Sequence, residues 1–119
     1  MEWILYFDQR PWTLNAERTW HYHKRAKIVK EWRDAFSLEA KDQGIPNLNK
    51  VSVEALPILP TRRLQDPANC FPAVKAAIDG LVDANVIEDD NPNFIDSIKF
   101  YSPAYVKGES GLFIKVITN

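Results

Sequence analysis

Hydrophobic and polar residues alternate in residues 2–7 and 49–56, and this alternation is the pattern of β-strands that bury one face. The expected strands cover residues 2–7, 49–56, 94–101 and 112–118. Pro57 and Pro60 are expected to end the second strand, because proline cannot donate a backbone hydrogen bond to a neighbouring strand. The last two strands are expected to be joined through a loop that contains Gly108 and Gly111.

Two further segments have the spacing of helices that are apolar on one face. In the first, the apolar positions are Ile28, Val29, Trp32, Ala35 and Phe36. Gly44 is expected to end this helix, with Pro46 just beyond it. The second helix is expected to begin near Pro72, since proline suits the first helical position. Its apolar positions are Val74, Ala77, Ile78 and Leu81.

The elements follow the order β-α-β-α-β-β, which predicts a small α+β domain with two helices packed on one mixed sheet. A chain of 119 residues, 45% hydrophobic and 26% charged, fits a single globular domain over residues 1–119. Residues 8–22 are expected to form a polar, aromatic loop, and connections of this length are usually either functional or disordered. So small a domain leaves some aromatic side chains for a subunit interface, which makes a homodimer plausible.

The single cysteine and the N-terminal residues bear on the compartment. Cys70 cannot form a disulfide within the chain and is expected to be a small core residue in a reducing cytoplasm. Residues 1–10 have too short an apolar run, and no basic leader, for a signal peptide. No run approaches the roughly 18 apolar residues of a membrane span. The sequence therefore predicts a cytoplasmic protein.

Charge is distributed unevenly, although the formal net charge is only −1. Residues 10–33 carry seven basic and two acidic side chains, whereas residues 66–96 carry seven acidic side chains and one basic. A basic half beside an acidic half suits a protein that binds phosphates and presents carboxylates to a cation. The alternative is two solvated helix faces of opposite sign.

Carboxylates flank the second expected helix. Asp66 lies just before it, and Asp89 and Asp90 lie just after it. Mg²⁺ prefers such oxygen ligands, and it can activate water for phosphodiester hydrolysis. The acidic turn either extends into water or gathers around a metal. Lys75 and Asp79, four residues apart on this helix, form either a weak surface ion pair or a group aimed at a scissile phosphate.

The segment from residue 62 to residue 95 is similar to the signature of RusA-type Holliday-junction resolvases. That signature is an Asp-x-Asp-Asn element, a helix with Lys-Ala-Ala-x-Asp-x-Leu, and an Asp-Asp turn before a strand. This chain reads Asp66-Pro67-Ala68-Asn69, then Lys75-Ala76-Ala77-Ile78-Asp79-Gly80-Leu81, then Asp89-Asp90. The N-terminal half matches more loosely, through a strand, a loop with Pro-Trp, and a helix with Trp32-Arg33-Asp34.

The resemblance implies a homodimeric crossover junction endodeoxyribonuclease that needs Mg²⁺ and nicks four-way DNA junctions in recombination and repair. Asp66, Asp90 and Lys75 would be catalytic. The metal would be bound by Asp66 and Asp90, with Asp89 and Asp79 as further candidate ligands. Such enzymes act in the cytoplasm of a bacterium or of a phage-infected cell, and many are phage-encoded.

The resemblance also suggests which residues contact DNA. The candidate phosphate contacts are Arg10, Arg18, Lys24, Arg25, Lys27, Arg62 and Arg63. Trp12, Trp20 or Tyr22 could stack on an unpaired base at a junction, and burial is the alternative for these aromatic residues. Trp32 is expected in the core, because it shares the apolar face of the first helix.

Two departures from the family pattern affect the site. Ala68 stands where the family has its second Asp, and three residues are inserted around Phe71-Pro72, which rotates Lys75 about the helix axis. Asp79 or Asn69 could supply a replacement oxygen. The alternatives are a junction-binding protein that has lost catalysis, and a small interaction protein with no DNA role.

Overall fold

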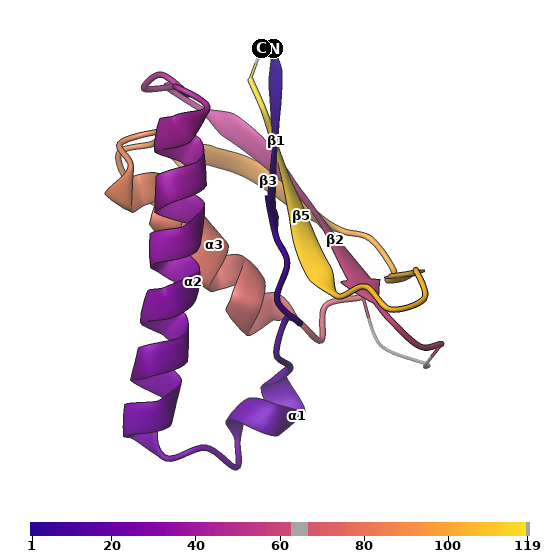
Figure 1. The fold of residues 1–119 in the computed structure, drawn as a ribbon. Coiled ribbons are helices and arrows are strands. Elements are labelled where there is room, and N and C mark those ends of the chain that lie inside the picture. The colour runs from indigo at the N-terminus through magenta and orange to yellow at the C-terminus, as the bar shows by residue number, and fades with distance from the viewer. Residues whose placement is uncertain (63–66, 119) are drawn as a thin grey trace.

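Five strands of the described chain, residues 1–62 and 67–118, form one mixed sheet in the computed structural model (Figure 1). They are β1 (Glu2–Phe7), β2 (Val51–Leu59), β3 (Ile95–Phe100), β4 (Ala104–Tyr105) and β5 (Gly111–Ile117). The order is β1-β5-β2-β3, and β4 also pairs with β2. β5 is antiparallel to both neighbours, whereas β2 is parallel to β3 and β4. The four predicted strands are therefore confirmed, and β4 is an addition.

Two long helices cover one face of this sheet, and a short helix precedes them (Figure 1). The helices are α1 (Leu14–Glu17), α2 (Tyr22–Asp42) and α3 (Phe71–Asp83). α2 and α3 lie against each other, and their apolar faces share a core with the sheet. The predicted α+β class, with two helices on a mixed sheet, is confirmed. No helix in the described part of the chain is long and apolar enough to cross a membrane.

Both long helices begin or end as their sequences indicate. Gly44 follows α2 with a φ of 66°, and its amide donates to the carbonyl of Lys41. This left-handed conformation is the helix stop that glycine favours. Pro72 lies in the first turn of α3, where a missing amide hydrogen costs nothing. Asn85, with a φ of 60°, follows the end of α3, and its role as a stop was not predicted.

The prediction that Pro57 ends the second strand is wrong, because β2 continues to Leu59. The amide of Tyr101 donates to the carbonyl of Ala55, so this side of β2 faces the chain after β3. The backbone nitrogen of Pro57 faces the same side, two residues on, in the interval between the β3 pairing that ends at Phe100 and the β4 pairing that begins at Ala104; β5 pairs with Pro57 on the other side. A proline is tolerated there because no ladder hydrogen bond is lost.

The expected loop at residues 8–22 is also corrected in part. It contains α1, whose N-cap Thr13 accepts a hydrogen bond from the amide of Ala16 through its side chain. The amide of Leu14 donates to the carbonyl of Asn69 at 3.0 Å, which ties this segment to the start of α3. The segment is therefore an ordered wall beside α3.

The core lies between the sheet and the two long helices. Trp32 and Phe36 of α2 are buried, as predicted, and Cys70 is fully buried at the start of α3. Gly80 allows the helices to approach closely, since a Cβ at this position would lie 2.6 Å from the carbonyl oxygen of Arg33. Any side chain there would force the two helices apart.

Candidate active site

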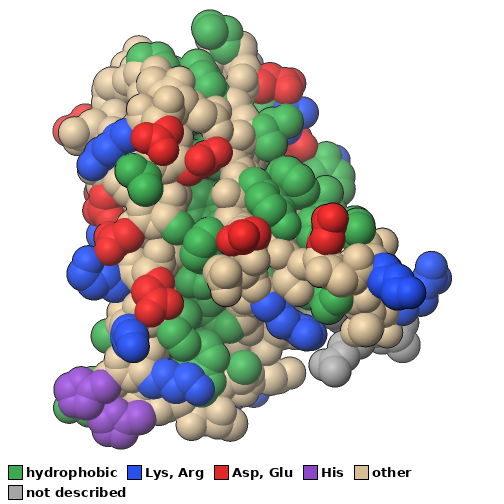
Figure 2. All heavy atoms as spheres, viewed as in Figure 1, with side chains coloured by type: hydrophobic (Ala, Val, Ile, Leu, Met, Phe, Trp, Pro, Cys, Tyr) green, Lys and Arg blue, Asp and Glu red, His purple; other side chains and the backbone are tan. Residues whose placement is uncertain are grey.

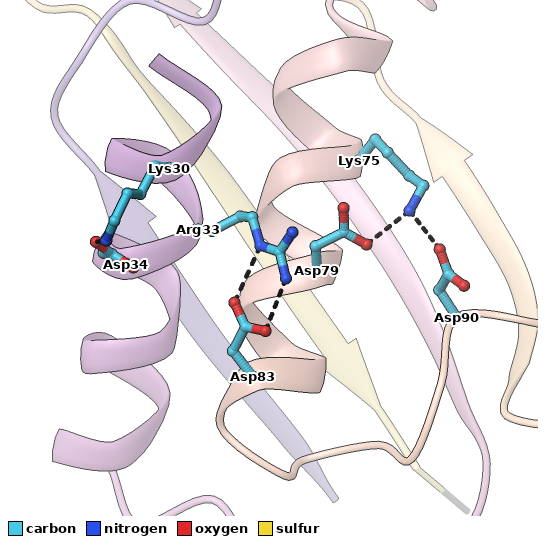
Figure 3. A network of polar contacts seen from close by, with 7 residues as sticks. All are labelled: Lys30, Arg33, Asp34, Lys75, Asp79, Asp83 and Asp90. Carbon is cyan, nitrogen blue, oxygen red and sulfur yellow. Dashed lines mark hydrogen bonds and ion pairs between the residues drawn. The ribbon is translucent and has the colours of Figure 1, made fainter. Parts of the chain in front are cut away.

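The side chain of Lys75 lies between two carboxylates that come from different parts of the chain (Figure 3). Its Nζ donates to Asp79 at 2.6 Å, one helical turn further along α3. The same Nζ donates to Asp90 in the loop after the helix. The structure therefore brings Lys75, Asp79 and Asp90 together.

These contacts change the protonation of the lysine and of its partner in the loop. Partial burial lowers the pKa of the Lys75 ammonium, but hydrogen bonds and charge interactions with Asp79 and Asp90 outweigh burial and raise that pKa above its ordinary value. The hydrogen bond from Lys75 lowers the pKa of Asp90. At neutral pH the centre therefore holds an ammonium ion against an ionised Asp90.

The loop after α3 is ordered by the side chains of its own turn. Asp89 accepts a hydrogen bond from the amide of Asp90 at 2.8 Å and another from the side chain of Asn91 at 3.2 Å. Asn91 in turn accepts from the amide of Asn93 at 2.9 Å. Asp89 therefore supports the turn that carries Asp90, and its carboxylate binds the turn rather than Lys75.

The remaining catalytic candidate cannot be compared with this geometry. Asp66 lies outside the described residues, as does Arg63 among the DNA-binding candidates. In the described part of the chain, no group of three or more His, Cys, Asp or Glu side chains is arranged to bind a metal. Among the described candidates, Asp79 and Asp90 both contact Lys75, whose ammonium lies between them.

A second ion pair of α3 lies on the side of the helix that faces α2 (Figure 3). Arg33 donates to both carboxylate oxygens of Asp83, at 3.0 and 2.8 Å. This hydrogen bonding lowers the pKa of Asp83 and raises that of Arg33. The sequence did not predict this pairing, because it depends on how the two helices pack.

A basic corner of the molecule lies at the start of α2, where the chain carries His21, His23, Lys24, Arg25 and Lys27. Both histidines lie at this corner of the molecule, with Lys and Arg side chains nearby (Figure 2). The exposed DNA-binding candidates are Arg10, Arg18, Lys24, Arg25, Lys27 and Arg62. Arg25 pairs with Glu17 of α1, and Lys24 lies over the ring of Trp20 at 4.9 Å. Arg62 lies 5.6 Å from the ring centre of Tyr105.

The three aromatic residues that were candidates for stacking on DNA differ in how far they are exposed. Trp12 is 7% exposed and packs edge-on against Trp32 at 5.4 Å, so it belongs to the core. Trp20 is half-buried beside Trp12. Tyr22 is 68% exposed and lies against the rings of His21 and His23. Of these three, only Tyr22 offers a largely open ring.

A groove of about 370 Å³ runs between α1, α2 and α3 and joins the basic corner to the lysine. Its charged lining residues are Glu17, Arg25, Lys75 and Asp79. Its apolar lining residues are Trp12, Leu14, Val29, Phe71, Pro72 and Ala76. Sequence spacing could not reveal this groove, since it needs the contact between the α1 segment and the start of α3.

Comparison with known proteins adds no relative: no protein-family model matches the chain, and a search of curated proteins found no match.

Proposed function

We propose that the protein is a nuclease that hydrolyses phosphodiester bonds in DNA, with its reaction centre at Lys75 and Asp90. The observation that carries this proposal is the ammonium of Lys75 held between Asp79 and Asp90. The centre opens on a groove that Arg25 of the basic corner also lines. A cation beside carboxylates, next to a basic surface, suits a bound phosphate and the charge that develops on it during hydrolysis.

Within this class, we propose a RusA-type Holliday-junction resolvase that acts on branched DNA in the cytoplasm. The resemblance of residues 62–95 supports this narrower assignment. Bound Mg²⁺ would supply the activated water and stabilise charge on the phosphoryl oxygens. Asp90 and Asp66 would hold the ion, and Asp79 would be a further ligand. Asp89 would act by holding the turn, because its oxygens already accept two hydrogen bonds there.

In this proposal, Lys75 and the exposed basic residues contact different phosphates of the DNA. Lys75 turns from its carboxylates to an oxygen of the scissile phosphate, which a lysine can do because it is a single charge on a flexible stem. Its raised pKa keeps it protonated at neutral pH. The exposed basic residues around the start of α2 bind phosphates on either side of the nick, as do Arg62 and Arg63.

One observation favours a second candidate, a junction-binding protein that does not cut. Ala68 replaces the second Asp of the family signature, so one expected carboxylate is missing. Such a protein would bind a four-way junction through the same basic surface, equally well with or without Mg²⁺.

A nicking assay on a labelled four-way junction, with a linear duplex as comparison, tests both candidates. We expect Mg²⁺-dependent nicks in the junction, and no nicks in EDTA. Asp66→Asn and Asp90→Asn should abolish nicking while junction binding survives, and Asp83→Asn is the matched control that should still cut. Binding should weaken steeply between about 50 and 200 mM salt. Binding without any nicking would support the second candidate, and the absence of salt-dependent binding would contradict both.

The resemblance also leads us to propose a homodimer, and the open face of the sheet is the candidate contact. A shallow apolar hollow of about 380 Å³ lies on this face, lined in part by Ile4, Leu56 and Phe113. Ile4 is 56% exposed although it is a large hydrophobic residue of β1. The oligomeric state of Ile4→Lys, measured by sedimentation, tests this contact. Leu38→Lys, at an exposed position of α2, is the control. A dimer that persists in Ile4→Lys would place the contact elsewhere.

A further inference from the structure

The groove beside Lys75 combines apolar walls with two ion pairs. Leu14 and Phe71 are both more than one-third exposed, and they contribute apolar surface from α1 and from the start of α3. The polar lining is the Lys75–Asp79 pair and the Arg25–Glu17 pair. A volume of about 370 Å³ lies within the range of small-ligand sites. The groove therefore suits a flat, mostly apolar group that carries polar atoms on its edge.

Glu17 brings a largely buried carboxylate to the groove. Its side chain is only 14% exposed, and Oε1 pairs with Nε of Arg25. A carboxylate accepts up to four hydrogen bonds, and one that is largely withdrawn from water is stabilised by an N–H donor that reaches a free lone pair. The groove thus presents an acceptor beside its apolar walls.

Trp12 adds a second buried polar atom beside the groove. Its Nε1 is buried and has no hydrogen-bond partner among the described residues. Buried polar groups usually have partners, so an unpaired indole N–H is uncommon in a packed core. The indole also lines the groove. The unpaired donor therefore belongs to a residue of the groove wall.

We propose that this groove binds one unpaired nucleobase of the DNA strand whose phosphate contacts Lys75, and that Glu17 favours bases with an exocyclic amino group. The inference rests on the proposed nuclease function and adds a base-binding site to it. The faces of a base match the apolar walls, and its phosphate matches Lys75 and Arg25. Adenine, cytosine and guanine offer an exocyclic amino donor to the carboxylate, whereas the N3–H of an unpaired thymine lies between two carbonyl oxygens that a carboxylate repels.

An abasic scan measures whether a base enters the groove. Binding is followed by fluorescence anisotropy in EDTA, so no nicking is needed, on four-way junctions and on short single strands with one base removed at each position in turn. For the wild type we expect removal of the base at one position to weaken binding by about 10-fold to 100-fold, the range of single base-stacking contacts. Leu14→Ala and Phe71→Ala should reduce this penalty, and the exposed Leu38→Ala should retain it.

A second comparison measures what Glu17 does. At the sensitive position, cytosine should bind several-fold more tightly than thymine. Glu17→Met removes both acceptor oxygens at similar length and should abolish the difference. Arg25→Met breaks the same ion pair but keeps the carboxylate, so overall affinity should fall while the ratio of cytosine to thymine survives. A ratio lost in Arg25→Met as well as in Glu17→Met would contradict the role of Glu17.

The outcomes separate this inference from the function on which it rests. Junction binding with no sensitive position, or with the same penalty in Leu14→Ala and Phe71→Ala as in the wild type, would overturn the base site alone. A sensitive position in single strands without any preference for junctions would overturn the resolvase proposal and support the base site. No binding of either DNA would overturn both.

Discussion

Lys75 and Arg33 both pair with carboxylates of α3, yet their surroundings differ (Figure 3). Arg33 forms two parallel hydrogen bonds to Asp83, and the pair joins α2 to α3. Lys75 instead divides one ammonium between Asp79 and Asp90, at the edge of a groove. A planar guanidinium that donates two parallel hydrogen bonds to one carboxylate is held in one geometry, whereas an ammonium on four methylenes can turn to another acceptor.

The difference indicates that two similar ion pairs on one helix have different roles, one structural and one in the proposed reaction. The Arg33–Asp83 pair adds to the contact between α2 and α3, and both carboxylate oxygens of Asp83 accept hydrogen bonds from Arg33. The Lys75 pair connects the helix to a loop that is itself ordered by Asp89. We therefore expect changes at Lys75 to alter the proposed reaction, and changes at Arg33 to alter only stability.

The largest effect is expected from Lys75→Gln. Loss of the ammonium removes the positive charge that is proposed to contact the scissile phosphate. The loss of one such electrostatic contact typically slows a reaction by about 100-fold to 1,000-fold. Single-turnover nicking of a four-way junction measures this, with junction binding by anisotropy alongside. Arg33→Gln is the matched control and should nick within about threefold of the wild type, as changes away from the reacting groups usually do. Equal loss in both variants would remove the distinction between the two pairs.

Gly80→Ala tests the packed side of α3. Alanine favours helices more than glycine by about 1 kcal/mol, so propensity alone would stabilise the protein. The added Cβ would lie 2.6 Å from the carbonyl oxygen of Arg33, however, and such overpacking typically costs about 1–3 kcal/mol. Urea unfolding should show a net loss of stability.

Gly44→Ala is the comparison for Gly80→Ala. Nothing lies within 4 Å of a Cβ at Gly44, and its φ is +66°. Its cost of about 1–2 kcal/mol is therefore conformational. If Gly80→Ala stabilises the protein, the helices are not as closely packed as the geometry indicates.

These two regions also differ in how far the sequence predicts them. Apolar spacing predicts both helices, and the charges four residues apart predict the contact of Lys75 with Asp79, because that contact is local. The contact with Asp90 was suggested only by resemblance, since it needs the loop to return beside the helix. The Arg33–Asp83 pair and the groove were not predicted, because both depend on the angle and distance between elements distant in the sequence.

Single residues show the same limit on the sheet and in the aromatic segment. Proline normally ends a central strand, yet Pro57 lies within β2 because the neighbouring chain leaves an interval there. The sequence left Trp12 open between burial and stacking on DNA, and its contact with Trp32 places it in the core. In both cases the local preference is real, and a neighbour that comes from elsewhere in the chain determines the outcome.

Cys70 tests whether the site end of α3 is packed as firmly as the other end. Burial raises the pKa of its thiol to about 11, above that of an exposed cysteine. A raised pKa in the folded state contributes stability that is present below about pH 8.5 and lost as pH rises through 11. We expect the wild type to lose about 1–2 kcal/mol more than Cys70→Ala between pH 8 and pH 10 in urea unfolding. Parallel pH profiles would show that the start of α3 opens to solvent.

The smallest effect is expected at Asp83, through the pH dependence of its ion pair with Arg33. Arg33 lowers the pKa of Asp83, so the pair stabilises the folded state above the ordinary range of a carboxyl group, and this contribution is lost as pH falls through and below it. Because both side chains are more than one-third exposed, solvent screening limits the contribution to less than about 1 kcal/mol. Asp83→Asn should therefore unfold slightly more easily than the wild type at pH 7.

The same comparison at pH 3 and at high salt completes the test of Asp83. The difference between the wild type and Asp83→Asn should shrink in both conditions, because protonation and screening each weaken the pair. Asp34→Asn, which removes the more exposed pair with Lys30, should change stability less at pH 7. A loss of junction nicking in Asp83→Asn, without a loss of folded protein, would mean that the second ion pair takes part in the reaction centre, and the contrast with Lys75 would then be one of degree.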